Sequence, residues 1–213
     1  MMSAKACIIF DMDGTLIDSS AAMTASVNYV RHTLGLEPIE QAFLEYSINQ
    51  PDQHLPKIFY NTEVYDPTHR ELFKEHYLTS TQSMIALYPH VRELLESLHV
   101  KATLAIATNA NDFFAHHMLS LMGIQEYFTC ILGANNVKAP KPNPDMIDTI
   151  IDLTSSTKNK TILVGDSVKD EYAARNAKVE FIFADWGYGT SETALLRAEN
   201  IQGLLTLLQK IIL

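Results

Sequence analysis

The sequence predicts an α/β fold: a doubly wound parallel sheet core with a small α-helical domain inserted into it. Three observations support this prediction. Short apolar runs are spaced along the chain, helical patterns alternate with them from residue 88 onward, and residues 17–86 break this alternation. The 213 residues are enough for one domain with a sizeable insertion, or for one large and one small domain.

Five apolar runs predict buried strands. Each run is nearly continuous in apolar residues, which is typical of parallel strands that helices cover on both faces. Cys7 and Cys130 lie in two of these runs, which indicates buried packing residues rather than a disulfide framework or a cysteine metal site. The five runs are residues 6–10, 102–107, 128–132, 161–164 and 179–183.

Apolar residues at helical spacing predict helices between the strands. In segment 91–98 they recur at i, i+3, i+4 and i+7, and similar faces occur in segments 146–151 and 204–212. Helix and strand therefore alternate from residue 88 onward, as in a doubly wound sheet. Such sheets bind ligands at the carboxyl ends of their strands, so polar residues that directly follow a strand are site candidates.

Residues 17–86 are predicted to form a helical cap domain, inserted after the first strand and its loop. Helical stretches at 20–34 and 69–84 are separated by glycine and proline residues, and convincing strands are lacking. The predicted core is then residues 1–16 together with 87–213. A domain beside a strand-end site is placed to act as a lid. The alternative is a domain that packs on the sheet edge and does not move.

The composition argues against several classes of function. The net charge of −9 disfavours a general binder of nucleic acid or anionic membranes, because both favour basic surfaces. No run approaches the roughly 18 apolar residues of a membrane span, and the first residues do not show the pattern of a signal peptide. We therefore expect a cytoplasmic protein that binds neither nucleic acid nor membrane.

The segment Asp11-Met12-Asp13-Gly14-Thr15-Leu16 directly follows the first apolar run. Two carboxylates one residue apart repel each other and are costly to keep ionised without a cation or a donor nearby. With a glycine for the turn and a small hydroxyl residue beside it, this loop indicates a site for a metal ion and an anion. An ordinary acidic turn after a strand is the alternative, since Asp and Gly are common turn residues.

Three further polar segments follow strands or precede helices. Taken alone, each has an ordinary explanation: a helix cap, a surface lysine before a proline turn, or a turn residue with an acid in the first turn of a helix. Lys138 and Lys141 are both candidates for the functional lysine near the second of these segments, but the Lys-Pro-x-Pro form favours Lys141. The segments are Thr108-Asn109, Lys141-Pro142-Asn143-Pro144-Asp145 and Gly165-Asp166-Ser167-Val168-Lys169-Asp170.

In this order and spacing, the four segments resemble the four motifs of the haloacid dehalogenase superfamily of phosphotransferases. The resemblance covers nearly the whole chain and implies a Rossmann-like core with a Mg²⁺ cofactor. The implied metal ligands are Asp11, Asp166 and the backbone carbonyl of Asp13, with Asp170 supporting them without contacting the ion. Oxygen ligands of this kind suit Mg²⁺.

The resemblance also implies a mechanism. Asp11 is the implied nucleophile and forms an aspartyl phosphate. Asp13 first protonates the leaving oxygen and then takes a proton from the attacking water. Thr108, Asn109 and Lys141 are implied to bind the substrate phosphate, and Thr108 and Lys141 are counted with the two aspartates as catalytic residues. Donors and cations already aimed at developing charge are usually the largest catalytic contribution.

Finer features narrow the predicted function. Asp13 separates the phosphatases and mutases of this superfamily from its dehalogenases, and segments 88–95 and 185–189 resemble phosphoglycolate phosphatase-like members. We therefore predict a Mg²⁺-dependent phosphatase, monomeric or homodimeric, acting on a small phosphorylated metabolite such as phosphoglycolate or a sugar phosphate. The alternatives are a phosphosugar mutase of the β-phosphoglucomutase type, a pyrophosphatase, a nucleotide phosphatase, and a non-catalytic binding protein.

The predicted insertion carries no specificity signature, but some of its charged residues are candidates for substrate contacts. Four cations are candidates for binding a substrate carboxylate or a second phosphate, with a solvated surface charge as the alternative: Arg31, Lys57, Arg70 and Lys74. Four histidines fall in the same region and would face either a substrate or, more commonly, the solvent: His32, His54, His69 and His76.

Overall fold

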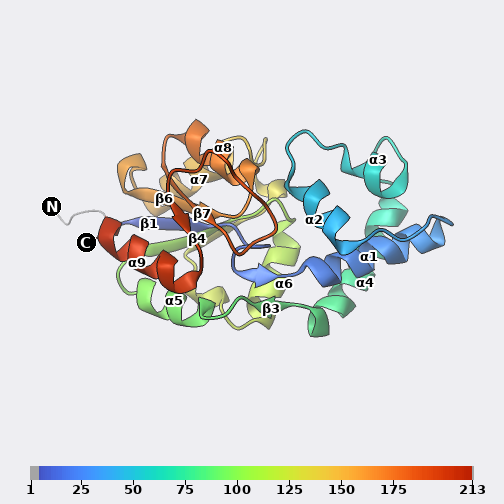
Figure 1. Cartoon of the computed structure of the whole chain (residues 1–213), viewed down its shortest axis with the longest axis horizontal. Helices are drawn as coiled ribbons and strands as arrows, with labels where there is room; N and C mark the ends of the chain where they lie inside the picture. Colours follow the sequence, from blue (N-terminus) through green and yellow to red (C-terminus); the bar gives the residue numbers. More distant parts are fainter. Residues whose placement is uncertain (1–4, 213) are drawn as a thin grey trace.

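Within residues 5–212, which the computed structural model describes, a six-stranded parallel sheet forms the centre of the molecule (Figure 1). The strand order is β5-β4-β1-β6-β7-β8, and every neighbouring pair is parallel. The strands are β1 (Cys7–Phe10), β4 (Thr103–Ala107), β5 (Cys130–Leu132), β6 (Thr161–Gly165), β7 (Glu180–Ala184) and β8 (Arg197–Ala198).

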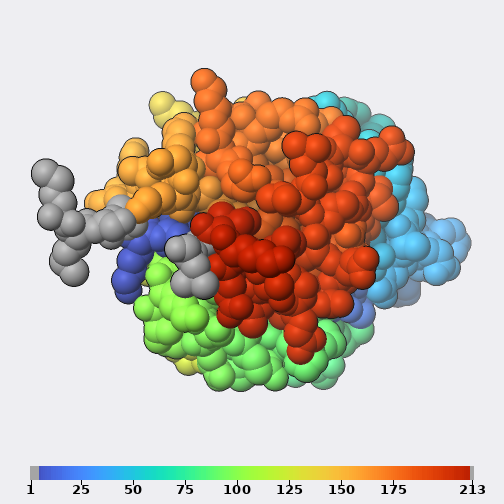
Figure 2. Space-filling view, turned by 60° about the vertical axis from the view of Figure 1, so that its left-hand side comes forward, coloured from blue at the N-terminus to red at the C-terminus, as the bar shows by residue number. Residues whose placement is uncertain are grey.

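Helices cover both faces of this sheet. Ile8 and Phe10 of β1 pack in one apolar cluster with residues of α5 (Val91–Leu98), α6 (Asp112–Leu121) and α9 (Ile201–Ile212). Cys7 and Ile9 pack in a second cluster with α7 (Asp145–Thr154) and α8 (Val168–Ala177). Figure 2 shows α9, in dark red, lying between the orange and the green segments, and α9 contacts α5. Because both sheet faces are covered, every residue of β1 is buried, which explains its unbroken apolar sequence.

Four helices between β1 and α5 form a separate group, the four-helix segment (residues 20–84, all within the described part of the chain). Figure 1 shows it to the right of the sheet. Residues of α1, α2 and α3 form an apolar cluster of their own, which includes Val30, Leu44 and Phe59, and α1 packs along α4. The helices are α1 (Ser20–Thr33), α2 (Gln41–Asn49), α3 (Leu55–Tyr60) and α4 (Pro67–Met84).

A two-stranded antiparallel ribbon connects the four-helix segment to the rest of the molecule. It pairs β2 (Ile17–Asp18) with β3 (Ala86–Leu87). The sequence analysis did not predict this ribbon, or β8, because a two-residue strand is too short to show an alternating pattern. Short 3₁₀ turns complete the described structure at η1 (Gln125–Tyr127), η2 (Ala134–Asn136) and η3 (Lys158–Lys160).

The strand order places the polar motifs side by side. The chain runs from β1 to β4 and β5 on one side, and then returns to β6 and β7 on the other. Phe10, the last residue of β1, pairs with Ile106 of β4 and with Val164 of β6. The segments that follow these three strands therefore meet at one edge, the switch point at which doubly wound sheets bind ligands.

The doubly wound α/β prediction is confirmed, and all five predicted strands are present with ends shifted by at most a few residues. Cys7 and Cys130 are both free thiols as predicted; Cys7 is buried, whereas Cys130 is only half-buried. Among residues 5–212, no helix combines the length and the apolar character needed to cross a membrane.

Candidate active site

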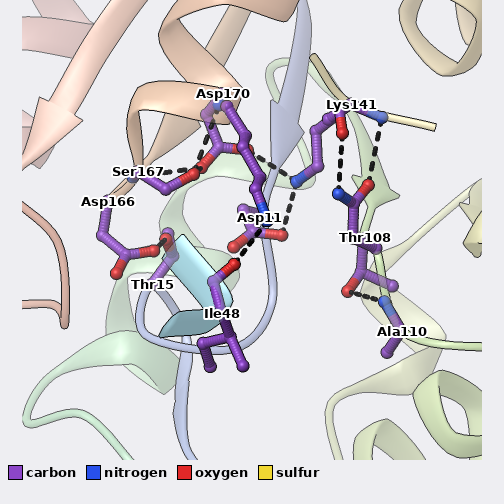
Figure 3. Close-up of polar contacts among 11 residues, drawn as sticks. Asp11, Thr15, Ile48, Thr108, Ala110, Lys141, Asp166, Ser167 and Asp170 are labelled. Atoms are coloured by element: carbon purple, nitrogen blue, oxygen red, sulfur yellow. Dashed lines mark hydrogen bonds and ion pairs between the residues drawn. The ribbon is translucent and has the colours of Figure 1, made fainter. Parts of the chain in front are cut away.

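A buried lysine joins two carboxylates at the switch point of the sheet (Figure 3). Lys141 Nζ lies 2.6 Å from Asp11 Oδ1, just after β1, and 2.6 Å from Asp170 Oδ1, in the first turn of α8. Lys141 is 4% exposed and Asp170 is fully buried. Burial alone would lower the pKa of Lys141, but the charges of Asp11 and Asp170 and the hydrogen bonds to them raise it above its usual value. Lys141 is therefore a fixed positive charge, and the competing Lys138 is exposed.

The backbone of Lys141 is held by the loop that follows β4. Asn109 Nδ2 donates to the Lys141 carbonyl at 2.8 Å, and the Lys141 N–H donates to Asn109 Oδ1 at 3.1 Å. The side-chain amide of Asn109 is thus used to fix Lys141. A phosphate contact from Asn109 would therefore come from its backbone N–H, and this contact remains a prediction.

Asp166 is fixed by three donors from distant parts of the chain. The Thr15 hydroxyl donates to Oδ1 at 3.2 Å, and the N–H groups of Tyr188 and Gly189 donate to Oδ2 at 2.7 and 3.3 Å. A Cβ on Gly187 would lie 2.2 Å from the Asp166 Cβ, so only glycine allows this backbone to approach so closely. Asp166 is fully buried and its carboxylate has one defined orientation.

Asp170 connects the lysine to the start of α8. Its Oδ2 accepts from the Ser167 N–H at 3.1 Å and from the Ser167 hydroxyl, while Ser167 Oγ accepts from the Asp170 N–H at 3.3 Å. This reciprocal arrangement is a capping box, which satisfies free N–H groups at a helix N-terminus. Asp170 therefore orients Lys141 from a rigid helix end.

The carboxylates suit a hard divalent cation. Asp11, Asp166 and Asp170 each offer one oxygen, and the three oxygens lie within 4.8 Å of one another. Burial raises the pKa of Asp166 to about 7, with repulsion from Asp170 adding to the shift. The pKa of Asp11 is also raised, first by burial and further by Asp170 and Asp166, although Lys141 opposes this. Buried carboxylates that repel one another, with oxygen as the only donor element, fit Mg²⁺.

Asp13 lies apart from this acidic cluster. The Ser19 hydroxyl, at the start of α1, donates to Asp13 Oδ1. Burial raises the pKa of Asp13 to about 6, although the Ser19 hydrogen bond and the charge of Lys141 oppose the shift. A carboxyl group that holds a proton near neutral pH is suited to general acid and base chemistry.

Thr108 follows β4 and is 1% exposed. Its Oγ1 accepts from the Ala110 N–H at 3.1 Å, so the hydroxyl is held within the loop (Figure 3). Thr108 does not cap the next helix; Asn111 does, since its Oδ1 accepts from the Phe113 N–H at 3.0 Å at the start of α6. Thr108 lines the same cavity as Asp11, Asp13 and Lys141, as a phosphate-binding hydroxyl requires.

This cavity has a volume of about 920 Å³ and is lined both by the strand-end loops and by helices of the four-helix segment. Of the candidates in that segment, His69, Arg70 and Lys74 line the cavity. Arg31 instead donates to backbone carbonyls of residues 37 and 59, and Lys57 forms an exposed ion pair with Glu63.

Sequence reasoning missed a supporting loop at residues 186–189. Trp186 Nε1 donates to the Thr15 carbonyl at 3.0 Å. The Tyr188 hydroxyl accepts from the Ser19 N–H at 2.7 Å and donates to Asp18 at 3.1 Å. The loop therefore holds Asp166, the first motif and the start of α1 together. In the sequence, residues 185–189 show only a family resemblance; the Trp-Gly-Tyr-Gly sequence of residues 186–189 is the signal that points to this role.

Lys169 is a second site-lining residue that sequence reasoning missed. Its Nζ donates at 2.5 Å to the Ile48 carbonyl, which lies in the last turn of α2 (Figure 3). Carbonyl groups at a helix C-terminus lack partners within the helix and attract cations. Lys169, which precedes Asp170 in the first turn of α8, thus links this helix end directly to the four-helix segment.

Comparisons with known proteins identify the family and the fold. The family model for haloacid dehalogenase-like hydrolases matches residues 8–184. A phosphoglycolate phosphatase of Agrobacterium fabrum is 32% identical over 84% of this chain and 80% of its own length. A crystal structure of a predicted phosphoglycolate phosphatase from Haemophilus somnus superposes with a TM-score of 0.82 at 22% identity, covering 98% of this chain and 100% of the other.

A third similar protein shares the fold alone. It is a candidate β-phosphoglucomutase from Thermotoga maritima, with a TM-score of 0.76 at 21% identity, covering 96% of this chain and 99% of the other. The family match extends over most of the chain, from β1 through the last residue of β7. The family and fold predicted from the four motifs are thereby confirmed: this chain belongs to the haloacid dehalogenase-like hydrolases.

Proposed function

We propose that this protein is a Mg²⁺-dependent phosphatase that hydrolyses a small phosphorylated metabolite through an aspartyl phosphate on Asp11. One observation carries the proposal: Lys141 Nζ lies 2.6 Å from Asp11 at the strand-end switch point, in a cavity that Thr108 and Asp13 also line. A phosphate monoester and a carboxylate nucleophile are both anions, so they react only where fixed positive charge offsets their repulsion. The relatives named phosphoglycolate phosphatase support this reaction class.

Asp11 attacks the phosphorus atom and the alcohol oxygen leaves. Lys141 holds Asp11 in place and presents positive charge to the phosphate oxygens, and Thr108 donates a hydrogen bond to one of them. Asp11 and Asp166, with the backbone carbonyl of Asp13, would hold the Mg²⁺ ion. When bound, the ion neutralises charge that develops on the transferred phosphoryl group.

Asp13 carries the proton. Its pKa of about 6 keeps a fraction of the side chain protonated near neutral pH, so that it can donate to the leaving oxygen. The resulting carboxylate then accepts a proton from the water that hydrolyses the aspartyl phosphate. The Ser19 hydroxyl fixes the orientation of the Asp13 carboxylate during both steps.

Residues 17–86 are proposed to serve as a cap domain that covers the reacting phosphate. Support comes from the cavity, which has walls from both parts of the molecule, and from the Lys169 contact with Ile48. A covered site excludes water other than the attacking molecule, and this strengthens electrostatic interactions inside it.

A phosphosugar mutase of the β-phosphoglucomutase type is the alternative within the same chemistry. It would use the same aspartates and lysine, but it would return the phosphoryl group to a sugar. The fold shared with the Thermotoga maritima protein is compatible with either reaction. Release of inorganic phosphate separates the two, because only the phosphatase transfers the group to water.

The test is phosphate release by the purified protein across phosphoglycolate, hexose phosphates, nucleotides and pyrophosphate. We expect release with Mg²⁺, loss of release with EDTA and recovery when Mg²⁺ is added back. Turnover that persists without divalent metal would contradict the proposed site. A folded protein that releases phosphate from none of these compounds would favour the mutase or a non-catalytic role.

A further inference from the structure

Six aromatic side chains line the same cavity as the proposed catalytic residues, and together they are called the aromatic wall. Its rings come from both sides of the cavity: three from α3 and α4, one from the loop between them, and two from α6. The side chains that form this wall are Phe59, Tyr60, Tyr65, Phe73, Phe113 and Phe114. A wall of this kind offers flat apolar surface to a ligand and little hydrogen bonding.

The rings of the aromatic wall pack against one another. Phe114 contacts Phe73 edge-on, with ring centroids 6.1 Å apart at 85°, and contacts Phe113 at 5.5 Å and 72°. Tyr60 and Tyr65 meet in the same manner at 6.0 Å and 67°. Phe113 nevertheless remains 49% exposed while lining the cavity, so its ring has a surface available to a bound molecule.

The cations of the cavity wall already have partners. Lys74 Nζ lies 3.2 Å from Glu71 and 5.6 Å from the centre of the Phe113 ring. The Arg70 guanidinium carbon lies 5.4 Å from the centre of the Tyr65 ring, and Lys169 donates a hydrogen bond to the Ile48 carbonyl. A two-carbon acid such as glycolate would leave most of the 920 Å³ unfilled and would have to compete for these cations.

Two polar atoms of the cavity wall lack partners. Asn49 Nδ2 and His69 Nδ1 are buried and have no hydrogen-bond partner among the described residues, and both side chains line the cavity. Buried polar atoms are nearly always paired in native structures. After small rotations of the two side chains, a ligand with heteroatoms on an apolar frame would supply the hydrogen-bond partners that both atoms lack.

We propose that the substrate is a phosphate monoester whose alcohol part carries a flat heteroaromatic ring, as a nucleoside monophosphate does. The phosphate lies at Asp11 and Lys141, the ring lies against the aromatic wall, and polar ring atoms meet Asn49 and His69. This inference rests on the proposed phosphatase function and specifies its substrate class.

The first experiment compares two esters with alcohol groups of similar basicity: ethyl phosphate and 2-phenylethyl phosphate. Because the chemical step is matched, the ratio of their kcat/KM values measures what the ring gains from the cavity. We expect a ratio of about 10 to 100, the gain for burying an aromatic ring. Phosphoglycolate and nucleoside 5′-monophosphates are measured alongside, and we expect the nucleotides to exceed phosphoglycolate.

A pair of matched variants locates the effect. Phe113→Ala should lower the ratio of the two kcat/KM values by about fivefold or more, because one face of the ring site is lost. Phe43→Ala is the control: Phe43 is 47% exposed on α2 and is not part of the cavity wall, so the ratio should not change. Thermal unfolding of both variants shows whether the fold is kept.

The outcomes separate this inference from the proposed function. No phosphate release from any ester would contradict the phosphatase; calorimetric binding of both esters to Asp11→Asn then still measures the preference for a ring. Equal kcat/KM for the two esters would overturn the substrate class while leaving the phosphatase intact. A higher kcat/KM for phosphoglycolate than for every ring ester would also overturn the substrate class. So would a Phe113→Ala variant in which the ratio of the two kcat/KM values is unchanged.

Discussion

The two ends of the cavity are built in different ways. At the strand-end site, buried Lys141 forms short, directional contacts with Asp11 and Asp170, and buried Asp166 accepts directional hydrogen bonds from a neighbouring loop. At the aromatic wall, rings meet edge-on and two polar atoms are left without partners among the described residues. The first arrangement holds the side chains in defined positions, as catalysis of phosphoryl transfer demands. The aromatic wall provides apolar contact area, which selects ligands by their shape.

If both proposals hold, chemistry and selectivity reside in different parts of this fold. The strand-end site is carried by the sheet, whose register places three loops side by side. Four of the six side chains of the aromatic wall come from the segment between β2 and β3: three from helices and Tyr65 from the loop between α3 and α4. Changes at the strand-end site should therefore abolish turnover of every substrate, whereas changes at the wall should alter the ranking of substrates.

The largest effect is expected at the nucleophile. Asp11→Asn keeps the size of the side chain but removes its charge, so turnover of all esters should fall at least about a thousandfold. The fold should be retained. Phosphate release and circular dichroism provide the two measurements, and the exposed Asp152→Asn serves as the control. Substantial residual activity would show that Asp11 is not the nucleophile.

Removal of the buried ammonium group tests the electrostatics of the strand-end site. Lys141→Met should reduce kcat by about a hundredfold or more, and should destabilise the protein by about 3–5 kcal/mol at pH 8 because Asp11 and Asp170 lose their partner. At pH 5 the loss should be smaller, because burial raises the pKa of Asp11 and removal of Lys141 raises it further, so that Asp11 takes up a proton more readily in the variant. Urea unfolding at both pH values measures this difference. A loss that does not depend on pH would contradict the assignment.

The close approach of the 186–189 loop to Asp166 allows the position of Asp166 to be tested by a change outside the four motifs. In Gly187→Ala the new Cβ would lie 2.2 Å from the Asp166 Cβ, so Asp166 must shift. We expect a loss of stability of about 1–3 kcal/mol and a fall in kcat of about tenfold or more. Gly203→Ala is the control: it lies in α9 with its nearest neighbour at 3.6 Å, and should stabilise the protein slightly. Unchanged activity in Gly187→Ala would show that the loop does not position Asp166.

Lys169 joins the strand-end site to the four-helix segment, and its removal should have an intermediate effect. Lys169→Met deletes the bond to the Ile48 carbonyl and should raise KM by about threefold to tenfold while kcat changes less. The exposed Lys210→Met serves as the comparison in steady-state kinetics. An effect confined to kcat would indicate that Lys169 acts on the reacting phosphate rather than on the four-helix segment.

The smallest effect is expected at Asp112, which anchors the loop after β4. Hydrogen bonds from Asn136 and Asn135 lower the pKa of Asp112 in the folded protein. A folded-state pKa below the unfolded value gives stability that is present above the unfolded pKa and is lost as the pH falls through the folded pKa. Asp112→Ala should therefore cost about 1 kcal/mol at pH 7 and less at pH 3, measured by urea unfolding. An equal cost at both pH values would show that charge is not involved.

Sequence patterns predicted the strand-end site better than the aromatic wall for physical reasons. Asp11, Thr108 and Asp166 each directly follow a buried apolar strand, so a local pattern and the rule for doubly wound sheets bring them together. Phe73 and Phe114 come from helices separated by β3, α5 and β4, and each looks like an ordinary core residue at helical spacing. Their meeting depends on how the four-helix segment lies over the sheet, which no local pattern encodes.

The supporting contacts of the strand-end site are harder to predict from the sequence than the motif residues, but easier than the aromatic wall. Tyr188 and Gly189 reach Asp166 across more than twenty residues, through backbone N–H groups that any sequence would carry. The side-chain amide of Asn109 is used on Lys141, a pairing that depends on two loops lying next to each other. The glycines at positions 187 and 189, where a Cβ would lie 2.2 Å from an atom of Asp166, leave a trace of these contacts in the sequence.

The most direct test of the central claim is chemical trapping of phosphorylated Asp11. The enzyme is quenched in acid during turnover and treated with borohydride, which reduces an aspartyl phosphate to homoserine, and its peptides are analysed by mass spectrometry. We expect homoserine at position 11 only when substrate is present, and none in Asp11→Asn. Phosphate release without reduction at position 11, or reduction at a different aspartate, would contradict the account.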